Sequence, residues 1–209
     1  MNKRQIEHFF KIVDAEFRQN AKVILTGAAA GTIMGSTRPS LDIDFGIELK
    51  KFSEKSWQAL ESAIKKAIDK TGIQANYAED IDRWGMISLH DYRRRTTLYK
   101  KYGKLSLHVL DPAYWSIGKM TRFLDPDVQD MLQVFRKKKV PPRRLAIVWG
   151  KALRVSPRST FITRFRRQVE GFFVTYGTKI WGKDFDPSHA IGQFHNAAGI
   201  DTVKRLKRG

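Results

Sequence analysis

The sequence contains no cysteine. This absence excludes disulfide bonds, thiolate zinc sites and thiol catalysis, and it is typical of proteins in reducing compartments. The sequence also has no run that approaches the roughly 18 apolar residues of a membrane-spanning helix. Its first ten residues, MNKRQIEHFF, lack the apolar stretch of a signal peptide. We therefore expect a cytoplasmic protein that makes no contact with a membrane.

Several common cofactor motifs are also missing. The five histidines show no metal-ligand spacing, which argues against a zinc site. The stretch 26–31 imitates the cofactor turn of short-chain dehydrogenases, but Ile33 stands where another glycine is needed, and no tyrosine is followed four residues later by lysine. The stretch 31–37 lacks the lysine of a P-loop. Dehydrogenases and P-loop enzymes are therefore poor interpretations.

Acidic residues are scarce in the second part of the chain. Residues 131–209 hold 18 Lys and Arg against 4 Asp and Glu, whereas residues 1–130 hold 21 against 17, and the whole chain has a net charge of +18. A basic segment beside a nearly neutral one is typical of proteins that bind polyanions. The alternative is a solvated basic face that serves solubility alone.

The hydrophobic pattern predicts an α/β fold. We expect a helix over 3–19, strands over 22–25 and 41–49, and a second helix that ends at Gly72. Further strands are expected near 73–78, 84–89, 95–100 and 104–110, and helices from residue 112 onward. These elements predict a mixed twisted sheet flanked by helices over 1–138 and a basic helical domain over 139–209. The basic run 136–139 and the two prolines 141–142 predict a linker.

Residues 41–49 alternate strictly between apolar and other side chains. On a strand this spacing puts Asp42 and Asp44 on the same polar face, with their carboxylates a few ångströms apart. Two carboxylates so close repel each other unless a hard cation lies between them, and Mg²⁺ favours such oxygen ligands. The alternative is an ordinary solvated strand face.

A glycine-rich turn precedes this pair: an apolar strand leads into Gly27 and Ala28, and Asp42-Ile43-Asp44 follows after thirteen residues. This arrangement resembles the signature of the polymerase-beta-like nucleotidyltransferase superfamily, in which a glycine followed by Gly or Ser precedes an Asp-x-Asp strand. Ala28 stands where that superfamily prefers Gly or Ser. Backbone N–H groups in such a turn can approach a phosphate closely.

The segment 110–131 resembles that of minimal nucleotidyltransferases of the AbiEii and DUF6036 kind, in which a helical Lys precedes a small helix opened by Asp-x-x-Asp. The matching residues are Lys119, Asp127 and Asp130. The alternative is local: Asp125 is a helix N-cap with Pro126 at the first helical position, and Lys119 is a solvated lysine.

The resemblance implies transfer of a nucleoside monophosphate from an NTP to an acceptor hydroxyl, with pyrophosphate as the leaving group. It implies that Asp42 and Asp44 hold Mg²⁺ and that Asp130 completes the catalytic site. The residues expected to contact the nucleotide are Gly27, Ala28, Ser36, Arg38 and Lys119. Members of this family often act as toxins of toxin–antitoxin or phage-defence pairs, and some modify tRNA. The implied partners are therefore RNA such as tRNA and a cognate antitoxin protein.

We expect the acceptor to bind the basic helical segment through its phosphates. The residues expected to touch it are Arg136, Lys137, Lys138, Lys139, Arg164, Arg166 and Arg167. The rival interpretation is a nucleic-acid-binding or partner-binding module on the same fold without turnover. Ala28 favours the rival, as does the lack of an obvious third strand carboxylate, for which Asp91 and Asp111 are the candidates.

Overall fold

The computed structural model describes residues 1–50, 53–77, 83–84, 87–88 and 91–200. The chain divides into two compact units. The first comprises Met1–Ile81 and Tyr92–Asp111, and the second comprises Asp82–Asp91 and Pro112–Gly209.

The first unit is built on a five-stranded mixed sheet in the order β3-β2-β1-β7-β6. Its strands are β1 (Ala21–Leu25), β2 (Asp42–Leu49), β3 (Gln74–Tyr77), β6 (Thr96–Tyr102) and β7 (Leu105–Leu110). Strand β1 pairs parallel with β7 and antiparallel with β2, while β2 pairs parallel with β3 and β6 antiparallel with β7. The expected mixed α/β sheet is confirmed.

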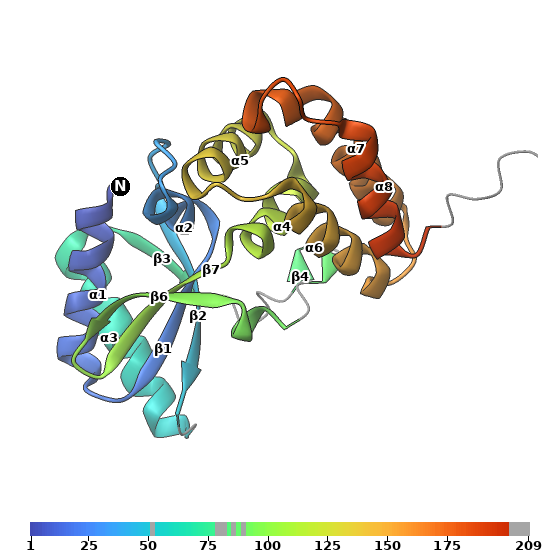
Figure 1. The fold of residues 1–209 in the computed structure, drawn as a ribbon. Helices are drawn as coiled ribbons and strands as arrows, with labels where there is room; N and C mark the ends of the chain where they lie inside the picture. Colours follow the sequence, from blue (N-terminus) through green and yellow to red (C-terminus); the bar gives the residue numbers. More distant parts are fainter. Residues whose placement is uncertain (51–52, 78–82, 85–86, 89–90, 201–209) are drawn as a thin grey trace, which may run out of the picture. The chain divides into compact units, whose positions relative to one another are not determined.

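Helices α1 (Lys3–Phe17) and α3 (Glu54–Thr71) lie along the same face of this sheet (Figure 1). Both begin at capping boxes, which satisfy the first free N–H groups of each helix, and Gly72 ends α3 in the left-handed conformation. On β2, Phe45 is fully buried and its ring packs edge-on against Phe10 of α1 at 5.6 Å. The odd-numbered residues of β2 therefore face the helices, and Asp42 and Asp44 lie on the other face.

The predicted alternation holds in the centre of β2 and fails at its start. Ile43 and Phe45 are fully buried, as expected. Leu41 was expected on the core face, but it precedes the strand and is 90% exposed. The strand begins only at Asp42, so the pleat does not direct the side chain of Leu41.

Strand β1 leads directly into helix α2 (Gly27–Met34), with Thr26 as the N-cap. Gly27 has a φ of +59°, a conformation that costs other residues more than it costs glycine. The chain therefore turns sharply at the end of the strand. The 3₁₀ helix η1 (Tyr92–Arg94) precedes β6.

The second unit is mainly helical. Its elements are β4 (Arg83–Trp84), β5 (Ile87–Ser88), α4 (Pro112–Arg122), α5 (Asp125–Lys138), α6 (Pro142–Val155), α7 (Thr160–Trp181) and α8 (Pro187–Ala198). Its core is aromatic: Trp149 of α6 packs against Phe172 and Phe173 of α7 at 5.6 and 5.5 Å. Phe165 and Phe172 are buried, whereas Phe161 is 47% exposed.

The division between the units falls at residue 111 instead of the expected 138. The physical reason is packing, because α4 contacts α5, α6 and α7, and α5 contacts α7. The expected linker is also shorter, since α5 continues through Lys138 and α6 begins at Pro142. None of the helices among the described residues combines the length and apolar character that a membrane span requires.

Candidate functional site

Asp42 and Asp44 converge on one side chain of the neighbouring strand. The register of β2 and β3 places Asn76 directly beside Asp44. The amide nitrogen Nδ2 of Asn76 donates to Asp42 Oδ2 at 2.8 Å and to Asp44 Oδ1 at 3.2 Å. Both carboxylates are half-buried. The two acids of the predicted pair therefore do point at a common position, which an amide donor occupies in the structure.

The start of α2 is packed against Asp44. The backbone N–H of Thr26 donates to the carbonyl oxygen of Asp44 at 3.0 Å. A Cβ atom on Gly27 would lie only 2.2 Å from Asp44 Oδ2, so glycine is required here for space as well as for its positive φ. The first turn of α2 contains no acidic residue, and the Thr26 side chain does not cap it. The partial positive charge of this helix end is thus presented to the Asp44 carboxylate.

These residues fit a hard divalent cation. Mg²⁺ in proteins is usually held by one or two carboxylates together with substrate phosphates and water. Asp42 and Asp44 supply the carboxylates, and a half-turn of the Asn76 amide would present its oxygen to the same point. In the part of the chain that the structure describes, no group of three His, Cys, Asp or Glu side chains could hold a metal. The strongest candidate for a metal site is therefore a carboxylate pair with an amide beside it.

Four of the five predicted nucleotide-binding residues lie at the two ends of α2. Gly27 and Ala28 begin the helix, and Ser36 and Arg38 follow its end, about 12 Å away along an eight-residue helix. The Ser36 N–H donates to the Gly31 carbonyl at 2.8 Å, and Ser36 Oγ accepts from the Arg38 N–H at 3.3 Å. These bonds fix the turn from which the chain runs back to Asp42.

The strand residue directly beside Asp44 carries an amide and not a carboxylate. Asp111 lies just beyond the end of β7, on the same edge of the sheet as the acid pair, and Asp91 lies in the second unit. The direct strand neighbour of Asp44 is Asn76, which sequence reasoning missed. The alternation of Gln74 and Asn76 with Ala75 and Tyr77 places the two amides on one face of the strand. An amide is a less obvious metal ligand than a carboxylate, so this pattern alone did not indicate a site.

Lys119, Asp127 and Asp130 form a buried ion cluster in the second unit. Lys119 Nζ lies 2.8 Å from Asp127 Oδ1 and 2.8 Å from Asp130 Oδ2. All three side chains are at most 3% exposed. The interpretation of Lys119 as a solvated lysine is therefore wrong, because α4 and α5 pack together and enclose its ammonium group. Asp125 is the first residue of α5 and Leu124 its N-cap, one residue away from the expectation.

Arg122 completes this cluster from the end of α4. Its Nη2 lies 2.8 Å from Asp127 Oδ1, and its Nε donates to Asp127 Oδ2 at 3.0 Å. Burial raises the pKa of Asp127, but the hydrogen bonds from Arg122 and Lys119 outweigh it and the pKa is lowered. Asp127 thus carries a stable negative charge inside the helical unit.

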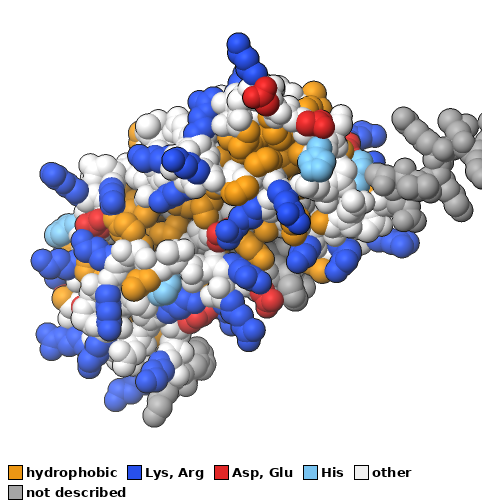
Figure 2. Space-filling model, in the orientation of Figure 1, with side chains coloured by type: hydrophobic (Ala, Val, Ile, Leu, Met, Phe, Trp, Pro, Cys, Tyr) orange, Lys and Arg blue, Asp and Glu red, His pale blue; other side chains and the backbone are white. Residues whose placement is uncertain are grey.

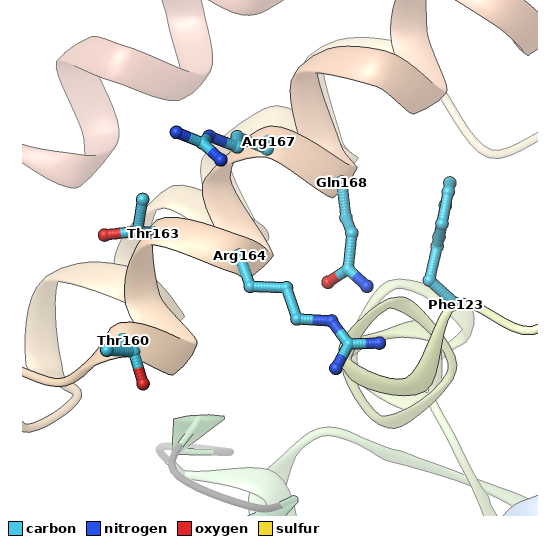
Figure 3. Close-up of a pocket in the computed structure, with 6 residues that line it drawn as sticks. All are labelled: Phe123, Thr160, Thr163, Arg164, Arg167 and Gln168. Atoms are coloured by element: carbon cyan, nitrogen blue, oxygen red, sulfur yellow. The ribbon is translucent and has the colours of Figure 1, made fainter.

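Two of the predicted acceptor-binding arginines line one pocket, which has a volume of about 550 Å³ (Figure 3). Arg164 and Gln168 extend from α7 toward Phe123, whereas Arg167 extends away from it. In the amide orientation that satisfies both its oxygen and its nitrogen, Gln168 accepts a hydrogen bond from Arg164 Nε at 3.3 Å and donates one to the Met120 carbonyl at 3.0 Å. The hydroxyls of Thr160 and Thr163 add further donors to the lining.

The remaining predicted basic residues lie elsewhere in the helical unit. Arg166 forms an ion pair with Glu170 at 2.7 Å, and Glu170 also contacts His195 at 2.6 Å. Arg136 donates from Nε to the Lys179 carbonyl at 2.9 Å and so connects α5 to α7. Lys137, Lys138 and Lys139 are exposed at the end of α5. Of the seven predicted residues, Arg164 and Arg167 share a pocket.

Comparison of the chain with protein-family models, with curated proteins and with solved structures found no significant match.

Proposed function

We propose that the chain is an Mg²⁺-dependent nucleotidyltransferase, which moves a nucleoside monophosphate from an NTP to a hydroxyl group of an RNA acceptor. The observation that carries the proposal is the convergence of Asp42 and Asp44 on one point, beside the start of α2. The order of strand, glycine turn, helix and acidic strand supports the proposal, because it is the order that the resemblance to the polymerase-beta-like superfamily implies. The proposed fold of the first unit is accordingly nucleotidyltransferase-like.

Asp42 and Asp44 would hold the cation with their facing oxygens, and Asn76 would turn to present its own oxygen. A bound Mg²⁺ supplies charge neutralisation for the triphosphate. The acceptor oxygen forms a bond to the α-phosphorus as the bond from that phosphorus to the bridging oxygen of the β-phosphate breaks, and pyrophosphate leaves. The hydroxyl proton passes to a carboxylate oxygen of the pair.

The start of α2 gives the triphosphate its binding surface. The N–H groups at Gly27 and Ala28 would point toward phosphate oxygens, and the helix dipole favours their negative charge. Ser36 and Arg38 would bind the same nucleotide from the turn before Asp42. Lys119 and Asp130 are buried in the second unit and their charges neutralise each other, so this proposal gives them a structural role.

The pocket with Arg164 and Arg167 is the proposed contact of the helical unit with acceptor phosphates. The family resemblance also makes tRNA a proposed acceptor and a cognate antitoxin protein a proposed partner. Arginine suits this task because its planar group can bind two phosphate oxygens at once.

The test is transfer of label from α-labelled NTPs to total RNA in the presence of Mg²⁺. We expect Asp44→Asn to abolish labelling while the protein remains folded, since the change removes a hard ligand from a half-buried face. Asp69→Asn on the exposed side of α3 is the matched control and should keep full activity. Wild-type labelling by Asp44→Asn would contradict the proposal.

A second candidate is an RNA-binding module that has lost turnover. Asn76 favours it, because an amide stands next to Asp44 where a carboxylate would give a third charged ligand. The same assay separates the two candidates. RNA binding without label transfer from any of the four NTPs would support the module.

A further inference from the structure

A basic groove lies in the first unit on the face of the sheet opposite α1 and α3, at the end away from the acid pair. Its volume is about 560 Å³, and its lining includes Lys22, Glu48, Lys101 and His108. An adjoining hollow of about 330 Å³ adds Arg18 and shares Asn20, Leu49, Lys50 and Lys104 with the groove. Both hollows are lined only by residues of the first unit. Because they share lining residues, we treat them as one recess.

The recess is strongly cationic. Its lining holds five Lys or Arg side chains and one carboxylate, Glu48. That carboxylate is already neutralised, because it lies 3.3 Å from Lys22 Nζ and 3.6 Å from Arg93 Nε. Among the residues that the structure describes, Lys101 and Lys104 have no carboxylate within ion-pair distance of their ammonium groups. A recess of this composition favours an anion with several charges.

This surface is not apparent from the sequence, since residues 1–130 have almost balanced charges. The fold brings together cations from the turn before β1, from β1 itself, from the end of β2 and from the β6–β7 hairpin. Figure 2 shows that Lys and Arg side chains cover the sheet unit as well as the helical unit.

The groove and the acid pair share one face of β2. Asp42, Asp44, Gly46 and Glu48 alternate along this face. Glu48 lies opposite Lys22, which in turn lies opposite Ser106 of β7. The separation from Asp44 to Glu48 is about 13 Å along the strand. A polyanion bound in the groove thus lies on the same face as the proposed catalytic carboxylates.

We propose that this groove binds the sugar–phosphate backbone of single-stranded RNA. Its role as the acceptor's docking surface rests on the proposed function, whereas RNA binding itself does not. Lys50, Lys101 and Lys104 supply exposed phosphate contacts at the rim, and His108 and Ser106 supply donors on the floor. Burial, followed by the nearby Lys22, lowers the pKa of His108. A phosphate beside the ring would raise that pKa again.

The experiment measures the affinity of a fluorescein-labelled single-stranded RNA for the full chain, without NTP or Mg²⁺, across a series of salt concentrations. We expect Lys101→Glu/Lys104→Glu to weaken binding about tenfold or more and to reduce the log–log salt slope by about 0.7 per lost contact. The matched control is Lys55→Glu/Lys65→Glu, which makes the same charge change on the opposite side of the sheet. Thermal melting checks that each variant is folded. If a Lys→Glu variant is not folded, the corresponding Lys→Gln variant is measured instead.

A second readout is the pKa of His108 in wild-type protein, followed by NMR with and without saturating RNA. We expect RNA to raise it. An unchanged pKa, or equal losses of affinity in the groove and control variants, would overturn the proposal. Competition by polyglutamate as strong as that by RNA at equal charge would also overturn it and would indicate an acidic protein partner. None of these measurements depends on catalysis. Failure of the RNA-binding proposal can therefore be told apart from failure of the proposed nucleotidyltransferase function.

Discussion

Two pairs of carboxylates, one in each unit, have nearly the same chemistry and opposite surroundings. Asp42 and Asp44 lie two residues apart on a strand, are half-buried, and share one neutral amide donor, Asn76. Asp127 and Asp130 lie three residues apart on a helix, are almost fully buried, and share the ammonium group of Lys119. The first pair is partly exposed to solvent, while the second is buried and paired with Lys119 and Arg122.

The difference shows that the motif spacing alone does not assign a role to a carboxylate. A buried ion cluster of complete charge pairs is costly to break but contributes little net affinity for an outside ligand. Two partly exposed carboxylates that lie close together repel each other, and binding of Mg²⁺ between them would relieve that repulsion. We therefore expect changes in the first pair to alter function and changes in the second to alter stability.

The largest expected effect is that of Lys119→Met. The change leaves two buried carboxylates without their shared cation, and we expect a loss of about 3–5 kcal/mol in the free energy of unfolding. Urea denaturation measures it. Asp44→Asn should change the same quantity by less than about 0.5 kcal/mol. Similar losses in the two variants would remove the distinction between the pairs.

Gly27→Ala should have the next largest effect. A Cβ atom there would lie 2.2 Å from Asp44 Oδ2, at a φ of +59°. We expect a loss of about 1–3 kcal/mol in stability from the crowding, together with displacement of the Asp44 carboxylate and reduced label transfer. Gly171→Ala is the control, because a Cβ at that helical position meets nothing within 4 Å. It should stabilise by about 0.5–1 kcal/mol.

The buried cluster should also make the free energy of unfolding depend on pH in the acidic range. The folded protein holds the pKa of Asp127 below its ordinary value of 3.8, so its contribution to stability is complete above that value and is lost as the pH falls through the lowered pKa. The unfolding free energy of Asp127→Asn should therefore depend less on pH below about 4 than that of the wild type. Urea midpoints at several acidic pH values measure this. An identical pH dependence in Asp127→Asn and wild type would contradict the assignment.

The elements that the sequence predicted are those determined by local pattern. Apolar spacing located α1 and α3, Gly72 marked the end of α3, and the alternation of 41–49 placed both aspartates on one face. The missed features depend on contacts between distant segments. Asn76 reaches Asp44 only through the register of β2 with β3, and Lys119 is buried only because α5 folds back along α4. The unit boundary likewise follows from the packing partners of α4 and α5.

The smallest expected effect, that of Asn76→Asp, tests the acid pair most directly. The substitution adds a third carboxylate at the point where Asp42 and Asp44 converge, and it exchanges two hydrogen bonds for repulsion. Without divalent cations we expect the melting temperature to fall slightly. With Mg²⁺ it should rise more than that of the wild type, because a ligand that binds only the folded state stabilises by RT ln(1 + [L]/Kd). Gln58→Glu, which adds the same charge on the exposed face of α3, should show no such gain with Mg²⁺. An equal Mg²⁺ response in Asn76→Asp and Gln58→Glu would mean that Asp42 and Asp44 do not form a cation site.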